Sequence, residues 1–149
     1  MATILVVDDE KDTVGLLRYM LEKDGHQVLE AFDGEGALKA VGLDPAGGEG
    51  AAPPVLPDII LLDVMMPKMD GYSVYARLQQ SERTKAIPVV VLTAKGKMWE
   101  LFENAQGVTA FMEKPFDPKY LRSHVKEALA KKPAPPPSGS PGAVPPGKP

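Results

Sequence analysis

The fold is decided by residues 58–71, which read DIILLDVMMPKMDG. Residues 58–62, apolar after Asp58, have the length of a strand, and Asp63 closes the run. A run that is apolar throughout, rather than alternating with polar residues, is typical of a strand buried on both faces of a parallel sheet. A loop that contains proline and ends in Asp70-Gly71 then leads into residues with helical spacing. The stretch therefore predicts a buried strand, with a carboxylate at its carboxyl end, followed by a helix.

The same strand-and-helix unit recurs along the chain. Four further apolar runs predict strands at residues 3–7, 27–32, 87–92 and 108–112. Asp33 is placed to begin a helix, Gly25 is placed to end one, and the last helix is expected over residues 118–131. Buried strands that alternate with amphipathic helices predict an α/β fold with an open, five-stranded parallel sheet, doubly wound, with helices on both faces.

Two segments fall outside this pattern. Of the 16 prolines, twelve lie in residues 45–57 and 133–149. We expect residues 42–57 to be an exposed, flexible insertion, because they are rich in Gly, Pro and Ala, and residues 132–149 to be a Pro-rich, disordered tail or linker, because they have almost nothing to bury. The folded domain is expected to span residues 1–131.

Composition excludes several classes of protein. The chain has no cysteine and two histidines, which excludes a disulfide scaffold and a thiolate or histidine-rich metal site. No apolar stretch reaches the roughly 20 residues of a membrane helix and no signal peptide is evident, so we expect a cytoplasmic protein without membrane insertion. Residues 1–70 hold 14 acidic and 5 basic side chains, and residues 71–149 hold 6 acidic and 12 basic ones. The basic residues are scattered, which argues against direct nucleic-acid binding.

Polar residues at the ends of the predicted strands form the candidate site. They are Asp8, Asp9, Asp63, Thr93 and Lys114. Ligands of open α/β sheets bind outside the carboxyl ends of the strands, so a ligand would meet these side chains. Three aspartates without a thiol nearby favour a hard cation, and Mg²⁺ suits the site because it needs few carboxylates and leaves positions for phosphate oxygens.

Taken one at a time, these residues also have ordinary structural explanations. Acidic residues 8–10 could cap a helix, Asp63 could belong to a turn, and Thr93 could end a strand. Lys114 could be a solvated surface lysine. One bound cation explains the aspartates together better, because carboxylates crowded at the mouth of apolar strands repel one another.

The order of the motifs resembles the receiver domain of bacterial two-component response regulators. Asp-Asp-Glu follows the first strand, Asp-Val-Met-Met-Pro-Lys-Met-Asp-Gly ends the third, Thr-Ala follows the fourth and Lys-Pro-Phe follows the fifth. The resemblance covers residues 2 to about 131 and implies the flavodoxin-like strand order 2-1-3-4-5. It implies a phosphorylation-dependent switch of a two-component or phosphorelay system rather than an enzyme, with weak self-catalysed phosphorylation and dephosphorylation.

By position, the resemblance assigns the metal ligands. It implies that Asp63 is the phosphoacceptor and a ligand of Mg²⁺, that Asp9 binds the ion directly, and that Asp8 acts through a bound water. The backbone carbonyl of Met65 completes the protein ligands. An aspartate is a weak nucleophile toward phosphorus, so charge neutralisation by the ion agrees with this assignment.

The resemblance also assigns the switch and the partners. Lys114 and Thr93 match residues that contact the phosphoryl group, and Phe111 matches the aromatic residue whose rotamer follows the threonine. The implied partners are a histidine kinase or phosphotransfer protein upstream and an effector protein downstream.

Two alternatives remain open on the sequence. A pseudo-receiver that binds partners without phosphorylation typically lacks acidic-pocket residues, whereas this chain has them. A phosphatase of the haloacid dehalogenase type also uses an aspartyl nucleophile, but it needs a second aspartate where this chain has Met65.

Overall fold

The computed structural model describes residues 2–50, 53, 55–64, 66, 69–93, 108–113 and 117–131. For residues 93, 109–111, 113 and 131 the description covers the backbone alone. The strands are β1 (Thr3–Val7), β2 (Gln27–Ala31), β3 (Ile59–Asp63), β4 (Val89–Thr93) and β5 (Val108–Glu113). The helices are α1 (Lys11–Lys23), α2 (Gly34–Ala40), α3 (Gly71–Gln80) and α4 (Pro118–Lys131).

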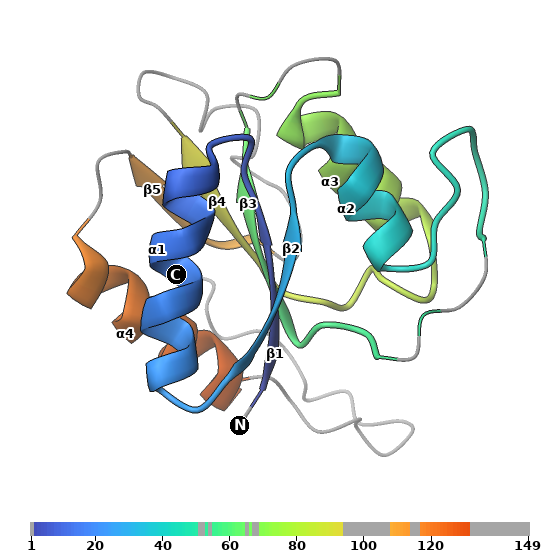
Figure 1. The fold of residues 1–149 in the computed structure, drawn as a ribbon. Helices are drawn as coiled ribbons and strands as arrows, with labels where there is room; N and C mark the ends of the chain where they lie inside the picture. Colours follow the sequence, from blue (N-terminus) through green and yellow to red (C-terminus); the bar gives the residue numbers. More distant parts are fainter. Residues whose placement is uncertain are drawn as a thin grey trace, which may run out of the picture.

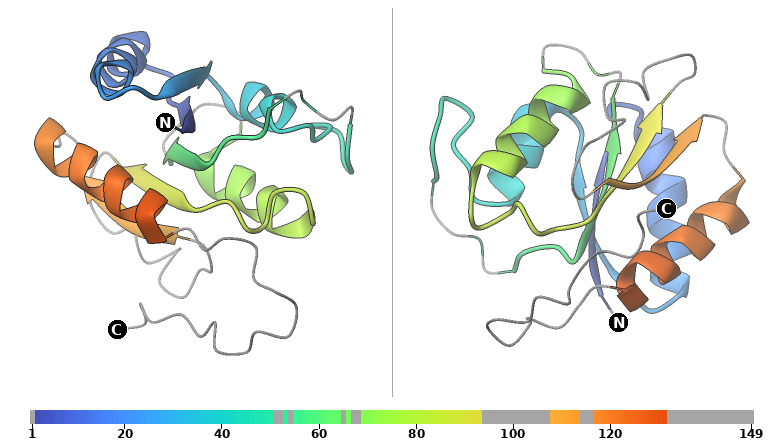
Figure 2. Two further views of the ribbon diagram at one scale, coloured as in Figure 1. Left: turned by 90° about the horizontal axis from the view of Figure 1, so that it is seen from below. Right: turned by 180° about the vertical axis from the view of Figure 1, so that it is seen from behind.

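The strands form one parallel sheet in the order β2-β1-β3-β4-β5 (Figure 1). Helices α1 and α4 cover one face, and α2 and α3 cover the other (Figure 2). The predicted α/β fold and its strand order are therefore confirmed. The segment between β4 and β5, where a doubly wound fold is expected to place a further helix, lies outside the described residues.

The core is divided by the sheet into two layers. Along β1, Leu5 and Val7 pack with α2 and α3, whereas Ile4 and Val6 pack with α1 and α4. Every residue of β1 and of β3 is buried. This burial on both faces explains why these strands are apolar throughout rather than alternating.

Some strand ends differ from the prediction. β4 begins at Val89 instead of residue 87, because the Ile87 N–H donates to the carbonyl oxygen of Thr84 in a turn, at 3.0 Å. β2 ends at Ala31, and Phe32 is partly exposed beyond it. β3 is shifted by one residue and includes Asp63 as its last member.

Two predicted helix boundaries are confirmed in atomic detail. The Asp33 carboxylate accepts a hydrogen bond from the Gly36 N–H at 2.7 Å and so caps α2. Gly25 follows α1 with φ of 90°, a conformation that glycine adopts without a steric penalty. Asp70 caps α3 in the same way through the Ser73 N–H at 2.8 Å.

The insertion differs from expectation over residues 42–50. Residues 44 and 46–50 are exposed as expected, but Leu43 is buried and bridges Glu49 in a small antiparallel turn. The Arg77 guanidinium donates to the carbonyl oxygens of residues 44, 45 and 48, and the Arg83 guanidinium donates to those of residues 42 and 50. Two cationic side chains therefore satisfy these carbonyl groups, and the flexibility expected for residues 42–57 stays a prediction.

Candidate functional site

Three predicted aspartates meet at one edge of the sheet. β1 and β3 are paired with Val7 opposite Leu62, so the residues that follow, Asp8 and Asp63, lie side by side. Carboxylate oxygens of Asp8, Asp9 and Asp63 lie within 4.8 Å of one another. Asp8 is 0% exposed and Asp63 2% exposed, whereas Asp9 is exposed to solvent. This set of hard oxygen donors, two of them buried, could hold a metal ion and fits a divalent cation.

Local hydrogen bonds fix the direction of the Asp8 carboxylate. The Asp8 N–H donates to the carbonyl oxygen of Ala31 at 3.1 Å, which carries the ladder past the end of β1. Its Oδ1 accepts a hydrogen bond from the Glu10 N–H at 2.9 Å, just before α1 begins. Glu10 itself is the N-cap of α1 and makes no side-chain cap. A local turn therefore explains the position of Asp8 but not the convergence of all three aspartates.

A tight loop follows the end of β3. The Val64 N–H donates to the carbonyl oxygen of Leu92 at 2.9 Å, and the Val64 carbonyl accepts from the Met66 N–H at 3.1 Å and the Gly71 N–H at 2.9 Å. A Cβ on Gly71 would lie 2.3 Å from the carbonyl oxygen of Asp63, closer than any side chain can approach. Glycine at position 71 thus lets α3 begin directly against the backbone of Asp63. Sequence reasoning placed this glycine in the loop motif but missed its steric role.

The remaining predicted site residues are described incompletely. Thr93 is the last residue of β4 and pairs with Glu113 of β5. It follows Leu92, the β4 residue that pairs with Asp63. The backbone of Phe111 in β5 lies opposite Val91. The side chains of Thr93 and Phe111 lie outside the described residues, as do Met65 and Lys114 altogether. The structure thus brings Asp8, Asp9 and Asp63 together, and the other assignments stay predictions.

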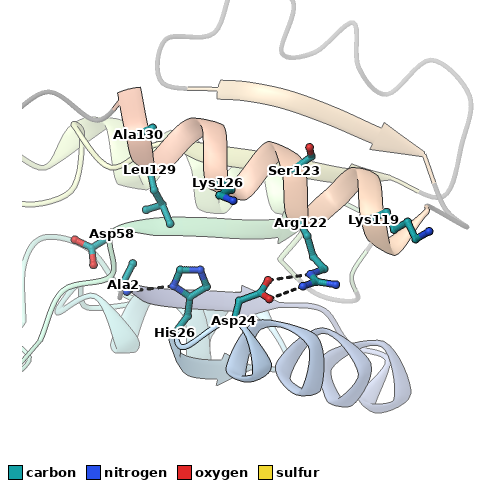
Figure 3. Close-up of a pocket in the computed structure, with 10 residues that line it drawn as sticks. All are labelled: Ala2, Asp24, His26, Asp58, Lys119, Arg122, Ser123, Lys126, Leu129 and Ala130. Atoms are coloured by element: carbon teal, nitrogen blue, oxygen red, sulfur yellow. Dashed lines mark hydrogen bonds and ion pairs between the residues drawn. The ribbon is translucent and has the colours of Figure 1, made fainter.

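A second concave surface lies at the seam between α1 and α4 (Figure 3). It is a groove of about 920 Å³ lined mainly by polar residues of α4 and of the segments around the amino end of β1. Two nitrogens of the Arg122 guanidinium bind the Asp24 carboxylate across it, one of them at 2.9 Å. This ion pair lowers the pKa of Asp24. None of the three clustered aspartates lines the groove, so it is separate from the candidate metal site.

Sequence comparison identifies the class of protein that this fold and site define. The sequence model of the response regulator receiver domain matches residues 4–126, and the chain belongs to that family. Receiver domains are the signalling phosphoacceptors of two-component systems and are not enzymes in the usual sense. Within the described part of the chain, no helix is both long and apolar enough to cross a membrane.

Curated relatives support this membership. The chain is 39% identical over 127 residues to the alkaline phosphatase synthesis transcriptional regulatory protein PhoP of Bacillus subtilis, covering 85% of this chain and 48% of PhoP. It is 34% identical over 131 residues to protein PilH of Pseudomonas aeruginosa, covering 87% of this chain and 99% of PilH. The chain thus spans about half the length of PhoP and nearly all of PilH.

Solved structures agree on the fold. The chemotaxis protein CheY4 of Vibrio cholerae matches with a TM-score of 0.71 and 27% identity, covering 86% of this chain and 98% of CheY4. The receiver domain of Francisella response regulator 1452 matches with a TM-score of 0.73 and 25% identity, covering 89% and 100% of the two chains.

Proposed function

We propose that this chain is a phosphorylation-dependent switch in which Asp63 accepts a phosphoryl group from a histidine kinase or phosphotransfer protein. The observation that carries the proposal is the meeting of Asp8, Asp9 and Asp63 at the carboxyl ends of β1 and β3, in a chain of the receiver family. Asp63 is the last residue of β3, the middle strand of the sheet, and its backbone is held by the ladder to β4.

In this proposal the transfer is a displacement at phosphorus. An oxygen of the Asp63 carboxylate forms a bond to phosphorus as the bond between phosphorus and the donor's leaving group breaks. Mg²⁺ supplies the positive charge that lets a carboxylate approach an anionic phosphoryl group. Asp9 holds the ion directly, Asp8 holds it through water, and the carbonyl oxygen of Met65 adds a ligand. The family assignment gives the Lys114 ammonium and the Thr93 hydroxyl the role of binding phosphoryl oxygens.

We propose that phosphorylation of Asp63 changes the surface of the protein through Thr93 and Phe111. When the Thr93 hydroxyl is drawn to the phosphoryl group, the Phe111 ring is free to turn inward, which changes the surface that an effector protein reads. The backbone supports this route, because Thr93 ends β4 and Phe111 lies in β5, the strand that pairs with β4. We propose a protein effector rather than direct nucleic-acid binding by this chain, and a cytoplasmic location.

The proposal is tested by incubating the protein with Mg²⁺ and acetyl phosphate and measuring the intact mass. One added phosphoryl group is expected, and it should disappear slowly through self-catalysed hydrolysis. Asp63→Asn should remain unlabelled because the amide lacks the nucleophilic oxygen charge. The matched control is Asp12→Asn, which removes an exposed carboxylate of α1 and should be labelled like the unaltered protein. Equal labelling of Asp63→Asn excludes Asp63 as the acceptor, and no labelling of the unaltered protein favours a phosphorylation-independent interaction module.

A further inference from the structure

The start of α2 makes a close contact with the loop that follows Asp63. A Cβ built on Gly34 would lie 2.8 Å from the Cβ, Cγ and Sδ atoms of Met69. Gly34 is the first residue of α2 and is buried, and Met69 packs against the core layer under α2 and α3. Only glycine at position 34 lets Met69 come this close.

Rigid contacts connect Met69 with the backbone of Asp63. Met69 is followed by Asp70, whose carboxylate caps α3, and by Gly71, whose N–H donates to the carbonyl oxygen of Val64 at 2.9 Å. The Cα of Gly71 lies against the carbonyl group of Asp63 so closely that no Cβ fits between them. A shift of the backbone at Met69 therefore has to be taken up at the end of β3.

Side-chain rotation cannot remove the whole clash that a residue larger than glycine would make. A cavity of about 250 Å³ lined by Asp33, Gly34, Glu35 and Met69 adjoins the contact, so the Cγ and Sδ atoms of Met69 have space to turn away. The Cβ of Met69 is attached to the backbone and has no such freedom. A methyl group at position 34 must therefore displace a backbone segment, either the loop at Met69 or the start of α2.

We propose that Gly34 is a positioning residue for phosphoryl transfer, acting through Met69 on the loop that holds the Asp63 carboxylate in register with Asp8 and Asp9. The proposal rests on the proposed function, because it concerns the geometry of the same acceptor. Gly34 lies on α2, apart from the three aspartates, and acts through Met69 and Gly71. Displacement of a reacting group by about 1 Å reduces rates by up to about a hundredfold.

The test compares the labelling kinetics of Gly34→Ala with those of the unaltered chain at saturating Mg²⁺. We expect the maximal rate with acetyl phosphate to fall about tenfold to a hundredfold. The half-saturating acetyl phosphate concentration should not change, because Gly34 is not part of the phosphodonor site. The Mg²⁺ dissociation constant, measured by calorimetry without phosphodonor, should rise. The urea midpoint of each variant shows how much of it is folded.

The matched control is Gly15→Ala, in the middle of α1. A Cβ at Gly15 meets no atom within 4 Å, so this variant should keep the labelling rate and gain helix stability. Met69→Gly removes the Cβ on the other side of the contact and should also lower the rate. In the double variant Gly34→Ala/Met69→Gly the losses should be less than multiplicative, because the clashing Cβ of Met69 is gone, whereas those of Gly15→Ala/Met69→Gly should be multiplicative.

Three results would overturn the positioning role. The first is a Gly34→Ala rate within twofold of the unaltered protein, and the second is a rate loss matched by an equal loss of folded protein. The third is independence of the Gly34 and Met69 effects. If the unaltered protein is not labelled at all, the proposed function fails. The positioning role is then tested by the Mg²⁺ dissociation constant of Gly34→Ala, and an unchanged constant would overturn it.

Discussion

Asp8 and Asp9 differ in burial and therefore in what their side chains contribute to folding. Asp8 is buried and accepts a hydrogen bond from the Glu10 backbone, so it holds the end of β1 to the start of α1. Asp9 is exposed, and its carboxylate adds negative charge to the cluster. Removing Asp9 therefore changes the electrostatics of the site, whereas removing Asp8 also removes a structural acceptor.

We expect Asp9→Ala to weaken Mg²⁺ binding and phosphoryl labelling together. Without Mg²⁺ the same variant should unfold at a higher urea concentration than the unaltered protein, because one of three mutually repelling charges is gone. The stabilisation that Mg²⁺ gives the unaltered protein should be nearly absent from the variant. Urea unfolding with and without Mg²⁺ measures both effects. Asp8→Ala serves as the comparison and should lose about 1 kcal/mol of stability with its hydrogen bond.

His26 makes the stability of the fold depend on pH. Its Nδ1 accepts a hydrogen bond from the Ala2 N–H at 3.2 Å, and burial lowers its pKa below the ordinary value of 6.5. The unfolded chain therefore binds a proton more readily than the folded one, and stability is fully present above pH 6.5 and falls as the pH drops through the lowered pKa. The urea midpoint of the unaltered protein should decrease between pH 7.5 and 5 by more than that of His26→Gln. Parallel curves for the two proteins would contradict this role.

At the scale of elements, α3 joins two parts of the molecule. Its first residue, Gly71, lies against the backbone of Asp63, and Arg77, near its other end, binds the insertion. Arg83, beyond the end of α3, closes the insertion by binding the carbonyl oxygens of Gly42 and Gly50 and the carboxylate of Glu49. The connection between α2 and β3 is therefore anchored to the helix that starts against the backbone of Asp63.

We expect Arg83→Ala to destabilise the protein by about 1–3 kcal/mol, because its charge-assisted hydrogen bonds hold both ends of residues 42–50. Limited proteolysis should then cut within this segment more readily. The control Lys85→Ala removes a lysine that is paired with Glu82 on the surface and should cost less than about 0.5 kcal/mol. An unchanged urea midpoint and cleavage pattern for Arg83→Ala would show that Arg77 alone is sufficient.

Across the whole molecule, the groove and the three clustered aspartates lie at opposite ends of β1. The Asp24–Arg122 ion pair joins the end of α1 to α4 across the groove, and these residues are 98 positions apart in the chain. Asp8 follows the other end of the same strand. The buried parallel sheet lies between the groove and the three aspartates.

Deleting residues 132–149 should leave the labelling rate unchanged. This segment follows α4, consists largely of proline, alanine, glycine and serine, and has almost no apolar side chain for a core. Acetyl phosphate labelling of a chain ending at Lys131 measures the effect, with Asp63→Asn in the same truncated chain as the blank. A large loss of rate would mean that the tail acts on the site.

The sequence by itself determined which segments became strands and helices. Apolar runs of strand length, helical spacing and the capping residues Asp33 and Asp70 are local signals, since they depend on neighbours within one turn or one strand. The same pattern placed Asp8, Asp9 and Asp63 at strand ends, because parallel strands bring their carboxyl ends to one edge.

How closely residues far apart in the chain meet follows from the tertiary structure. The register of Val7 with Leu62, the contact of Gly34 with Met69 and the binding of Gly42 by Arg83 join segments that share no local pattern. A backbone carbonyl is present on every residue, so no sequence signal shows which one an arginine will bind. A glycine needed for close approach likewise looks the same as a glycine in open space, such as Gly15, until its neighbours are in place.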